Sequence, residues 1–475
     1  MKNKKYNNLI NGQLQGAAEY LSIFSPIDGS LIGETPSMSQ KDIDGVMEAA
    51  KAAQPSWEKI PRKEKAKLLY KTADLLEQHV DEIAEIMMWE IAKSLKDAKN
   101  EIIRTADLLR YTADIGVEST GEIISGGSFD STAENKHAFI TRKAMGVVLA
   151  IASFNYPVNL AASKIGPALM GGNAVVVKPA SQGAISTLSL IKAFIDAGIP
   201  AGVVNSVTGK GSIIGDYIVT HSLVNFINFT GSTKVGEHIG KLAGIKPILC
   251  ELGGKDAALV LPDADLDLTA KEIVAGAFSY SGQRCTAIKR VLVTSENADK
   301  LTNKLQKIVK ELSVGMPQDN PTIVPVINNA AVEQTRLLDE DAIKKGATAI
   351  LPLKIEKNLV YPTLLDHVTG DMDLAWVEPF SPILPIIRVQ SVEEMIEVAN
   401  ASEYGLQSSV FSNDLQQAQK VSNALDVGTV QINNRTQRGP DNFPFLGIKK
   451  SGIGIQGIKY SIESMTQMKS IVVDM

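Results

Sequence analysis

The chain has 475 residues, of which 44% are hydrophobic and 21% are charged, a composition typical of folded globular proteins and not of disordered or fibrous ones. Its 48 Lys and Arg residues against 53 Asp and Glu residues give a net charge of −5, which argues against nucleic acid or an anionic membrane as a partner, because both favour a basic surface. Two cysteines cannot form a disulfide framework, so we expect a protein of the reducing cytoplasm.

The sequence predicts neither a membrane segment nor a metal site. The first residues, MKNKKYNNLINGQ, are basic, but no apolar run follows them as it would in a signal peptide. Residues 144–163 carry no charge, yet they include Asn155, Pro157 and Asn159, which are costly in lipid, so we expect a buried strand, a loop and a helix there. Five histidines and two cysteines, without a C-x-x-C or H-E-x-x-H pattern, lead us to expect no metal.

The first long stretch of the chain, from Ser39 to about Ile115, has a helical pattern. Pro61 suits the first position of a helix, and the apolar residues after it recur at helical spacing: Leu69, Ala73, Leu76, Val80, Ile83 and Met87. A second long helix is predicted over Ser94 to Ile115, with Arg104 beside its apolar stripe. The residues expected to be buried in that stripe are Ile102, Ile103, Ala106 and Leu109.

After Gly146, short β-rich runs alternate with helical segments. Strands are predicted over residues 147–152, 174–179, 203–207 and 224–230, and the helices between them include Leu160–Met170 and Ile185–Ala197. A second alternating series runs from Ala257 to Val430 and beyond, with strands at residues 291–293, 383–389 and 427–432. Such alternation predicts parallel βαβ units, and therefore two α/β domains with a doubly wound sheet in the first.

Two segments lie outside this alternation. The segment from Gly121 to Arg142 interrupts the first domain and predicts a projecting hairpin. The final run, Met468–Asp474, predicts a strand with no partner nearby in the sequence. A lone terminal strand is a candidate for pairing with another subunit, because its backbone N–H and C=O groups would otherwise stay unpaired.

Cys285, in SGQRCTA, is the candidate nucleophile. It follows an apolar helix pattern over Ile273–Tyr280, and a lone cysteine in such a place is more often an inert buried thiol. Its neighbours are small and polar, however, and Arg284 is adjacent; a guanidinium and a helix terminus both lower a thiol pKa and favour the thiolate. Cys250, within the apolar run 247–252, is expected to belong to the core.

Three further motifs follow predicted strands. Glu251, in CELGGKDAAL, is a candidate general base, because apolar surroundings raise a carboxyl pKa; a structural ion pair explains it equally well. Asn155, in SFNYP, can donate its amide N–H to an oxyanion or simply form a turn before Pro157. Residues Gly231–Gly236 (GSTKVG) have the position and outer glycines of a dinucleotide fingerprint but lack its middle glycine.

In their order and approximate separations, the motifs resemble the aldehyde dehydrogenase superfamily over essentially the whole chain. They are SFNYP, Lys178-Pro179, GSTKVG, ELGGK, GQRCT and EPF (Glu378–Phe380). A second set looks like the NADP-dependent branch that oxidises glyceraldehyde 3-phosphate without phosphorylating it. It comprises Arg104, Tyr156, the triplet Arg284-Cys285-Thr286 and TQRGPDNFPFLG (Thr436–Gly447).

The resemblance implies an α/β fold of three parts. A Rossmann-type NADP-binding domain is expected over residues 1–120 and 143–252, and an α/β catalytic domain over 253–447. A small β oligomerisation arm with the C-terminal strand is expected over 121–142 and 448–475, in a homotetramer. In the implied mechanism the Cys285 thiolate attacks the aldehyde carbon, Asn155 and the Cys285 backbone N–H hold the oxyanion, and Glu251 activates the water that hydrolyses the thioester.

The implied activity is the irreversible NADP-dependent oxidation of D-glyceraldehyde 3-phosphate to 3-phosphoglycerate. Ser181 stands where many NAD-using relatives have a glutamate, so no carboxylate there repels the 2′-phosphate of NADP. Glu378 is expected to hold the nicotinamide ribose and Lys178 the adenosine ribose. The full cofactor set is Ala152, Lys178, Ser181, Lys210, Asp216, Gly231, Ser232, Gly236 and Glu378, and the substrate set is Arg104, Asn155, Tyr156, Arg284, Cys285, Thr286 and Arg438.

Two alternatives to this function remain open. One is another NAD(P)-dependent dehydrogenase for an anionic aldehyde such as succinate semialdehyde, since guanidinium groups fit a carboxylate as well as a phosphate. The other is an inactive protein on the same fold, against which the intact Cys285, Glu251 and Asn155 argue. Departures from the family pattern, at Ala152-Ser153, at Ser381 and in FLGIKKSG, remove no catalytic group.

Overall fold

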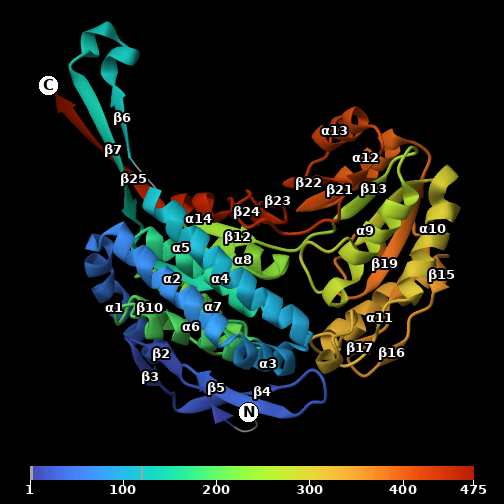
Figure 1. Cartoon of the computed structure of the whole chain (residues 1–475), viewed down its shortest axis with the longest axis horizontal. Helices are drawn as coiled ribbons and strands as arrows, with labels where there is room; N and C mark the ends of the chain where they lie inside the picture. Colours follow the sequence, from blue (N-terminus) through green and yellow to red (C-terminus); the bar gives the residue numbers. More distant parts are fainter. Residues whose placement is uncertain (1–3, 119–120) are drawn as a thin grey trace.

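Two largely parallel sheets and a projecting β arm organise the chain (Figure 1). The computed structural model describes residues 4–118 and 121–475. The two sheets lie side by side, each covered by helices, and the arm extends from the first of them. The expected α/β fold of three parts is confirmed, whereas the boundaries between the parts remain a prediction.

The first sheet has six strands in the order β10-β9-β8-β11-β12-β24. Its first five strands are parallel, and β24 is antiparallel to β12. The strands predicted over residues 147–152, 174–179, 203–207 and 224–230 are confirmed as β8, β9, β10 and β11. Their sequences are continuous apolar runs because a parallel sheet is buried on both faces. The bounds are β8 (Val147–Ile151), β9 (Ala174–Lys178), β10 (Val204–Ser206), β11 (Phe226–Thr230), β12 (Ile248–Glu251) and β24 (Gly452–Ile453).

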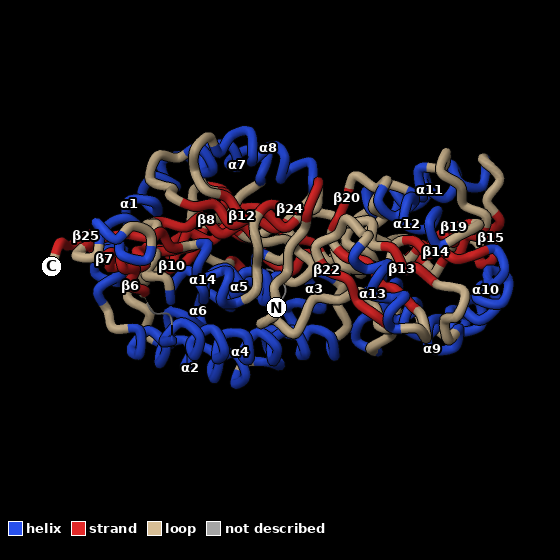
Figure 2. Tube along the Cα trace, turned by 90° about the horizontal axis from the view of Figure 1, so that it is seen from above, coloured by secondary structure: helices blue, strands red, loops and turns tan. Residues whose placement is uncertain are grey.

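Helices cover both faces of this sheet (Figure 2). Along β8, Val148 and Ala150 face the core shared with helices α2 to α6, whereas Val147 and Leu149 face the core shared with α1, α7 and α8. This alternation follows from the two-residue period of a strand. These helices are α1 (Gln40–Lys59), α2 (Arg62–Gln78), α3 (Val80–Ile91), α4 (Leu95–Glu118), α5 (Pro157–Met170), α6 (Ala184–Ala197), α7 (Gly211–Thr220) and α8 (Thr233–Ala243).

The helical pattern predicted over residues 39–115 is confirmed as α1 (Gln40–Lys59), α2 (Arg62–Gln78), α3 (Val80–Ile91) and α4 (Leu95–Glu118). Pro61 is the residue before α2 and not its first helical residue. The prediction that Ile103 is buried was wrong, since its side chain is 45% exposed. Successive residues of a helix point about 100° apart, so Ile103 leaves the core that Ile102 enters.

The second sheet has seven strands in the order β15-β18-β19-β14-β13-β21-β22, and β15 alone is antiparallel to its neighbour. The predicted strands near residues 291–293, 383–389 and 427–432 correspond to β14, β19 and β22. The strands are β13 (Ala257–Val260), β14 (Arg290–Thr294), β15 (Thr348–Leu351), β18 (Thr363–Asp366), β19 (Ile383–Val389), β21 (Gln407–Phe411) and β22 (Thr429–Ile432).

The helices of this second part flank its strands in sequence. The first of them, α9, ends at Phe278 and not at Tyr280 as predicted, because Tyr280 and Ser281 have φ values of +51° and +54° that no right-handed helix accommodates. The bounds are α9 (Leu266–Phe278), α10 (Ser295–Lys310), α11 (Asn329–Lys344), α12 (Val392–Asn400) and α13 (Leu415–Asn423).

The arm is a three-stranded sheet in the order β25-β7-β6, with β6 (Glu122–Ser125), β7 (Lys136–Ala144) and β25 (Thr466–Asp474). The hairpin predicted within Gly121–Arg142 is confirmed. The C-terminal strand, however, is not alone: β25 pairs with β7 along its whole length, from Thr466 opposite Ala144 to Asp474 opposite Lys136. The chain returns to the arm from the far end of the sequence, a pairing that no local pattern reveals.

The segment before β25 lies with the first sheet and not with the arm, to which residues 448–475 were assigned as a whole. β24 adds to β12, and α14 (Ile458–Ser464) packs against α4 and α5. Smaller sheets complete the fold. They are β1 (Lys4–Lys5), β5 (Leu31–Ser37) and β4 (Glu19–Phe24); β2 (Asn8–Ile10) and β3 (Gln13–Gln15); β16 (Ile355–Glu356) and β17 (Leu359–Val360); β20 (Tyr404–Gly405) and β23 (Ile448–Lys449).

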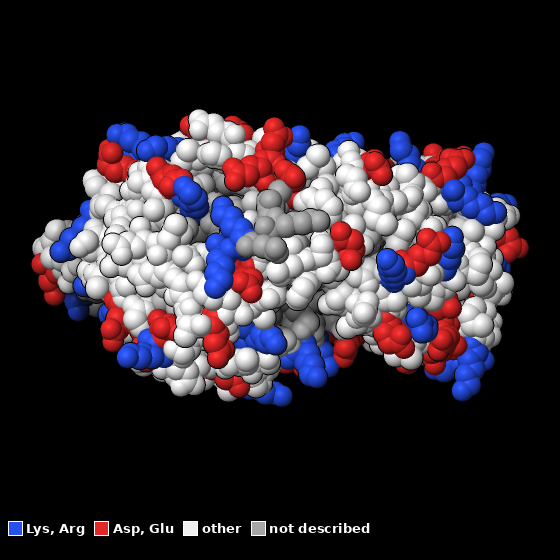
Figure 3. Space-filling view, turned by 90° about the horizontal axis from the view of Figure 1, so that it is seen from below, with Lys and Arg blue, Asp and Glu red and all other residues white. Residues whose placement is uncertain are grey.

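The surface carries both signs of charge. On the face drawn in Figure 3, lysines and arginines alternate with aspartates and glutamates across both parts of the molecule. Across the residues that the structure describes, no helix is long and apolar enough to cross a membrane.

Candidate active site

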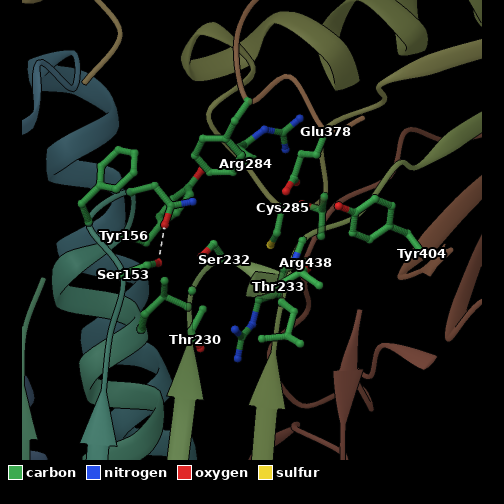
Figure 4. A pocket seen from close by; sticks show the side chains of 18 of the residues that line it. Ser153, Tyr156, Thr230, Ser232, Thr233, Arg284, Cys285, Glu378, Tyr404 and Arg438 are labelled. Carbon is green, nitrogen blue, oxygen red and sulfur yellow. Dashed lines mark hydrogen bonds between the residues drawn. The ribbon is translucent and has the colours of Figure 1, made fainter. Parts of the chain in front are cut away.

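The motifs meet between the two sheets, where the strand ends of one sheet lie opposite the strand ends of the other. In the first sheet, β8, β11 and β12 end at Ile151, Thr230 and Glu251, so the loops that follow them share its carboxyl edge. In the second sheet, Cys285 lies shortly before β14 and Glu378 shortly before β19, so both lie at its amino edge. The space between the two edges is a cavity of about 620 Å³ (Figure 4). Ligands of open α/β sheets bind at this carboxyl edge.

The cavity brings most of the predicted catalytic and substrate residues together. In Figure 4 the Cys285 sulfur lies in its middle, with Ser153 and Tyr156 on one side and Glu378 and Tyr404 on the other. The predicted residues in its lining are Arg104, Asn155, Tyr156, Gly231, Ser232, Arg284, Cys285, Thr286, Glu378 and Arg438. The predicted residues outside the lining are Ala152, Lys178, Ser181, Lys210, Asp216, Gly236 and Glu251.

Cys285 lies in surroundings that disfavour its thiolate form. Burial raises the pKa of its thiol to about 11, and the nearby carboxylates of Glu251, Asp256 and Glu378 raise it further, whereas the charge of Lys289 lowers it. The expectation that Arg284 and a helix terminus lower this pKa was therefore wrong. Burial away from water disfavours the thiolate more strongly than the charge of Lys289 favours it. The helix α9 ends at Phe278, well before the cysteine.

Asn155 is held close to the nucleophile by its own side chain. Its amide Nδ2 donates to the carbonyl of Gln283, two residues before Cys285, at 3.0 Å, and its Oδ1 accepts from the Ser153 hydroxyl at 2.7 Å. Both groups fix the orientation of the amide at the cavity wall. An N–H already aimed at the cysteine loop is in position to donate to an oxyanion formed beside Cys285.

A buried ion pair behind Asn155 was missed by the sequence reasoning. The Lys93 ammonium donates to the Asn155 carbonyl at 2.6 Å and pairs with Glu101, whose other oxygen accepts from the N–H groups of Val158 and Asn159 at the start of α5. Neither side chain reaches the solvent. Lys93 and Glu101 resemble ordinary surface charges of a helical region, so no local signal could have found them.

Glu251 makes the ion pair that the sequence reasoning left open. Its Oε2 accepts from Arg438 Nη1 at 3.2 Å and from the Thr230 hydroxyl at 3.3 Å, and Thr230 in turn accepts from Lys164 Nζ at 2.7 Å. Its Oε1 is buried and has no partner within the described chain. One oxygen is thus anchored while the other remains able to accept a proton, so the ion pair and the role of base are compatible.

Three guanidinium groups form the polar wall of the cavity, and the carboxylate of Asp441, which lies outside the lining, contacts two of them. Arg104 makes a bidentate pair with Asp441, through Nε and Nη2 at 2.7 Å each, and Arg438 lies 3.6 Å from the same carboxylate. Arg284 donates to the Gly276 carbonyl, and its Nε is buried without a partner in the described residues. The three guanidinium groups outnumber the two carboxylates that they contact, Asp441 and Glu251, so the cluster keeps a net positive charge that suits a small anion.

Tyr156 completes this wall as a neutral donor, since burial raises the pKa of its phenol to about 12. Asp441 was missed as a site residue, although it lies within the motif TQRGPDNFPFLG. The structure shows why it belongs there: its carboxylate orients two of the arginines. Thr286 lines the cavity beside them, and its carbonyl accepts from the Thr436 hydroxyl at 2.8 Å.

The first sheet offers a fitting place for a dinucleotide. Ser232 is the residue before α8, but its hydroxyl does not cap the helix, so it is free to meet a phosphate at the positive helix end. At Gly253, a Cβ would come within 2.3 Å of Glu378 Oε2, so the lack of a side chain there keeps room for that carboxylate in the lining. The residues on this side of the cavity therefore fit the expected cofactor.

The other predicted cofactor residues extend along the same edge. Lys178 ends β9, and burial lowers the pKa of its ammonium to about 8, with the Pro179 carbonyl as its hydrogen-bond acceptor. Lys210 precedes α7 and is exposed, while Ser181 is half-buried. Asp216, on α7, pairs instead with His238 on α8 at 2.8 Å.

Two small residues in the predicted cofactor set serve packing. At Gly236, a Cβ would come within 2.2 Å of the Leu252 side chain, so this glycine lets α8 approach the end of β12. The Ala152 N–H donates to the Lys178 carbonyl at 3.3 Å, which ties the loops after β8 and β9 together. Among the described residues, no group of three His, Cys, Asp or Glu side chains is arranged to hold a metal ion.

Comparisons with known proteins agree with this geometry. The model of the aldehyde dehydrogenase family matches residues 14–471. The NADP-dependent glyceraldehyde-3-phosphate dehydrogenase of Streptococcus equinus is 55% identical over 471 residues, which cover 99% of each chain. The protein of the same name from Triticum aestivum is 47% identical over 474 residues, which cover 99% of this chain and 95% of that one.

Solved structures give the same result. The crystal structure of the NADP-dependent glyceraldehyde-3-phosphate dehydrogenase of Bacillus halodurans, complexed with NADP, superimposes with a TM-score of 0.98 at 48% sequence identity. The match covers 99% of both chains, so it includes the two sheets, the cavity and the arm.

Proposed function

The chain belongs to the aldehyde dehydrogenase family, and we propose that it catalyses the irreversible oxidation of D-glyceraldehyde 3-phosphate to 3-phosphoglycerate with NADP. The observation that carries this proposal is the cavity itself. It places one thiol, Cys285, beside the amide of Asn155 and opposite a wall that contains three guanidinium groups. Full-length similarity to enzymes named for this substrate and cofactor supports the same conclusion.

The reaction begins with the nucleophile. Cys285 gives its proton to solvent water, and its sulfur adds to the aldehyde carbon to form a thiohemiacetal. The Asn155 Nδ2–H and the Cys285 backbone N–H stabilise the oxyanion that develops on the former carbonyl oxygen. NADP held along the carboxyl edge of the first sheet would supply the acceptor for the hydride of this carbon. The product on the enzyme is a thioester with Cys285.

Hydrolysis then requires a positioned base. Glu251 takes the proton from a water molecule as the water oxygen attacks the thioester carbon, and the sulfur leaves as thiolate. The anchored Oε2 and the unpartnered Oε1 of Glu251 support this role. The released acid is 3-phosphoglycerate, and the overall step consumes one water for each aldehyde.

The substrate phosphate binds the arginine wall in this proposal. Arg104, Arg284 and Arg438 line the cavity together with Tyr156 and Cys285. A guanidinium group matches a phosphate through two parallel hydrogen bonds, so several of them favour a doubly charged anion over a neutral aldehyde. Arg104 and Arg438 already contact Asp441, so the phosphate meets oriented side chains.

The NADP pocket and the assembly are further parts of the proposal. Lys178, Lys210 and Ser181 are the residues we expect around the 2′-phosphate, because they add positive charge and no carboxylate. The exposed outer edge of β25, together with the β6–β7 hairpin, is the surface we expect to contact other copies in a homotetramer.

One assay tests the function. The purified enzyme with D-glyceraldehyde 3-phosphate and NADP, in buffer free of inorganic phosphate, should form NADPH and 3-phosphoglycerate in equal amounts. Phosphate-free buffer excludes a phosphorylating dehydrogenase, which would need that anion. A higher kcat/KM with succinate semialdehyde than with the phosphorylated aldehyde would assign the protein to another branch of the family, and no turnover of either would indicate an inactive protein.

A further inference from the structure

Lys289 occupies the space behind the nucleophile and has no role in the mechanism given above. Its ammonium group donates to the backbone carbonyl of Cys285 and forms an ion pair with Glu378 Oε1 at 3.0 Å. Its side chain is only 2% exposed. One buried cation therefore touches the catalytic cysteine and the carboxylate expected to hold the nicotinamide ribose.

The backbone fixes this lysine firmly. Lys289 immediately precedes β14, and its N–H donates to the Asp256 carbonyl at 2.9 Å, just before β13. The amino ends of two neighbouring strands thus determine where its side chain starts. Glu378 is held from the other side, because its Oε1 also accepts from the Gly254 N–H at 3.2 Å.

The charges around Cys285 give this contact an electrostatic consequence. Three carboxylates face the thiol: Glu251 from the end of β12, Asp256 from the loop before β13, and Glu378 from the loop before β19. All three disfavour the thiolate, and the charge of Lys289 opposes them. Two other buried basic side chains nearby are engaged elsewhere: Lys255, whose pKa burial lowers well below its usual value, donates to the Val377 carbonyl, and Arg290 donates to the carbonyls of Lys255, Val398 and Ala399.

We propose that Lys289 is a positioning residue that joins the nucleophile to the cofactor site, by fixing the backbone of Cys285 and the carboxylate of Glu378 with one ammonium group. The proposal rests on the proposed function, which makes Cys285 the nucleophile and Glu378 a cofactor ligand. Without the lysine, Glu378 loses its ion-pair partner, and the thiolate forms among three carboxylates with no opposing charge bonded to its own peptide group.

The first test measures the thiol alone and needs no substrate. We compare the rate at which iodoacetamide alkylates Cys285 in the wild-type enzyme, in Lys289→Met and in Lys289→Arg, between pH 7 and 10, with peptide mapping to separate Cys285 from Cys250. At pH 8 we expect about three- to tenfold slower alkylation in Lys289→Met. A rise of one pKa unit lowers the thiolate fraction tenfold, and the greater nucleophilicity of the more basic thiolate restores part of the rate.

Lys289→Arg should restore most of the rate, because it keeps the charge. Lys65→Met is the matched control. Lys65 is also a buried lysine that donates to a backbone carbonyl, that of Glu58, but it lies on α2 outside the cavity lining. Its loss should leave the alkylation profile unchanged. An unchanged profile in Lys289→Met would overturn the proposal.

The second test measures the link to Glu378. NADPH binding, followed by its fluorescence, is compared in Lys289→Met, Glu378→Gln and the double variant. We expect the two losses of affinity to be non-additive, because each substitution breaks the same ion pair. Strictly additive losses would overturn the link.

Glu378→Gln alone provides a check that does not depend on folding of a Lys289 variant. It removes one of the facing carboxylates and frees the lysine, so Cys285 should react faster at pH 8 than in the wild type; an equal or slower rate contradicts the proposal. A negative result in these tests would not change the amounts of NADPH and 3-phosphoglycerate that the wild-type enzyme forms. The role of Lys289 and the proposed function can therefore be disproved separately.

Discussion

At the scale of single residues, the cavity balances cations against carboxylates around one thiol. Arg438 pairs with Glu251, and Arg104 pairs with Asp441. Under the proposed function, a substrate phosphate competes with these two carboxylates for the arginines, so we expect the site to favour a doubly charged group. Partly exposed and buried ion pairs both contribute little net stability, so the value of these two pairs lies in orientation.

Glu251→Ala should separate the two halves of the reaction. Acylation of Cys285 and hydride transfer need no base for water, whereas release of the acid does, and general bases contribute about 10²–10⁴-fold. We expect a burst of about one NADPH per active site, as for other thioacyl enzymes blocked in hydrolysis, and a covalent adduct on Cys285 by intact-protein mass spectrometry.

The control for this experiment is Cys285→Ala, which should show neither burst nor adduct. Steady turnover of Glu251→Ala at a near-normal rate would exclude Glu251 as the base. Slow turnover without an adduct would instead place its action earlier, in removing the thiol proton.

Arg284→Leu should lose kcat/KM for the phosphorylated aldehyde. Arg284 directly precedes the nucleophile in the chain, and its guanidinium group is anchored to the Gly276 carbonyl and keeps its Nε unpartnered among the described residues. We expect a loss of ~2–5 kcal/mol in transition-state stabilisation, from steady-state kinetics. An equal loss with an uncharged aldehyde would show that the arginine does not recognise the phosphate.

Ser181→Glu should erode the preference for NADP over NAD. The wild-type enzyme is expected to prefer NADP by at least ~10-fold, equivalent to about 1.4 kcal/mol from one charge-assisted contact. A carboxylate at position 181 would repel the 2′-phosphate and accept hydrogen bonds from ribose hydroxyls. The ratio of the two kcat/KM values measures the effect, and equal values in the wild type would exclude the assignment of this pocket.

At the scale of elements, the ends of strands and helices determine the site. Parallel strands of the first sheet deliver Asn155, Thr230 and Glu251 to one edge, and the loops before β14 and β19 deliver Cys285 and Glu378 from the other sheet. The start of α5 is fixed by a carboxylate from α4, so the helix that follows Asn155 begins at a defined position.

Glu101→Gln should destabilise this junction. The substitution leaves the Lys93 ammonium buried without its ionic partner, and breaking a buried pair on one side costs about 3–5 kcal/mol. We expect the free energy of unfolding, measured by chemical denaturation, to fall by this amount. The double variant Lys93→Met/Glu101→Leu removes both charges and should recover part of the loss; a double variant less stable than Glu101→Gln would contradict this explanation.

At the scale of the whole molecule, the arm is held by a strand from the far end of the chain. β25 pairs with β7 over its full length and is mostly exposed on its other side. Several apolar side chains of the arm are exposed in the single chain, among them Ile123, Phe129, Ile471 and Val472. Exposed apolar side chains beside an unpaired strand edge are typical of a surface that another copy covers.

Removal of Met468–Met475 should disrupt assembly. The deletion unpairs β7 from its neighbour and exposes a new sheet edge, so we expect smaller oligomers or aggregates by light scattering. Circular dichroism of the truncated chain serves as the control for folding of the two α/β parts. A truncated protein that runs as the same oligomer would show that the arm is not the interface.

The sequence by itself determined the order of elements and the chemical groups of the site. Strands such as β9 and β19 were predicted because parallel strands buried on both faces are continuous apolar runs, and the motifs follow such strands directly. Cys285, Asn155 and the arginines were found because each lies within a short run of characteristic neighbours. These features depend on residues close together in the chain.

The tertiary structure alone decided which distant residues touch. The pairing of β25 with β7, the Arg104–Asp441 pair and the Lys289–Glu378 pair join residues far apart in the sequence, so no local period or motif contains them. The pKa of the Cys285 thiol is likewise decided by the tertiary structure. Its pKa depends on how completely packing removes water and on which charges the fold places around it, and both are properties of the assembled cavity.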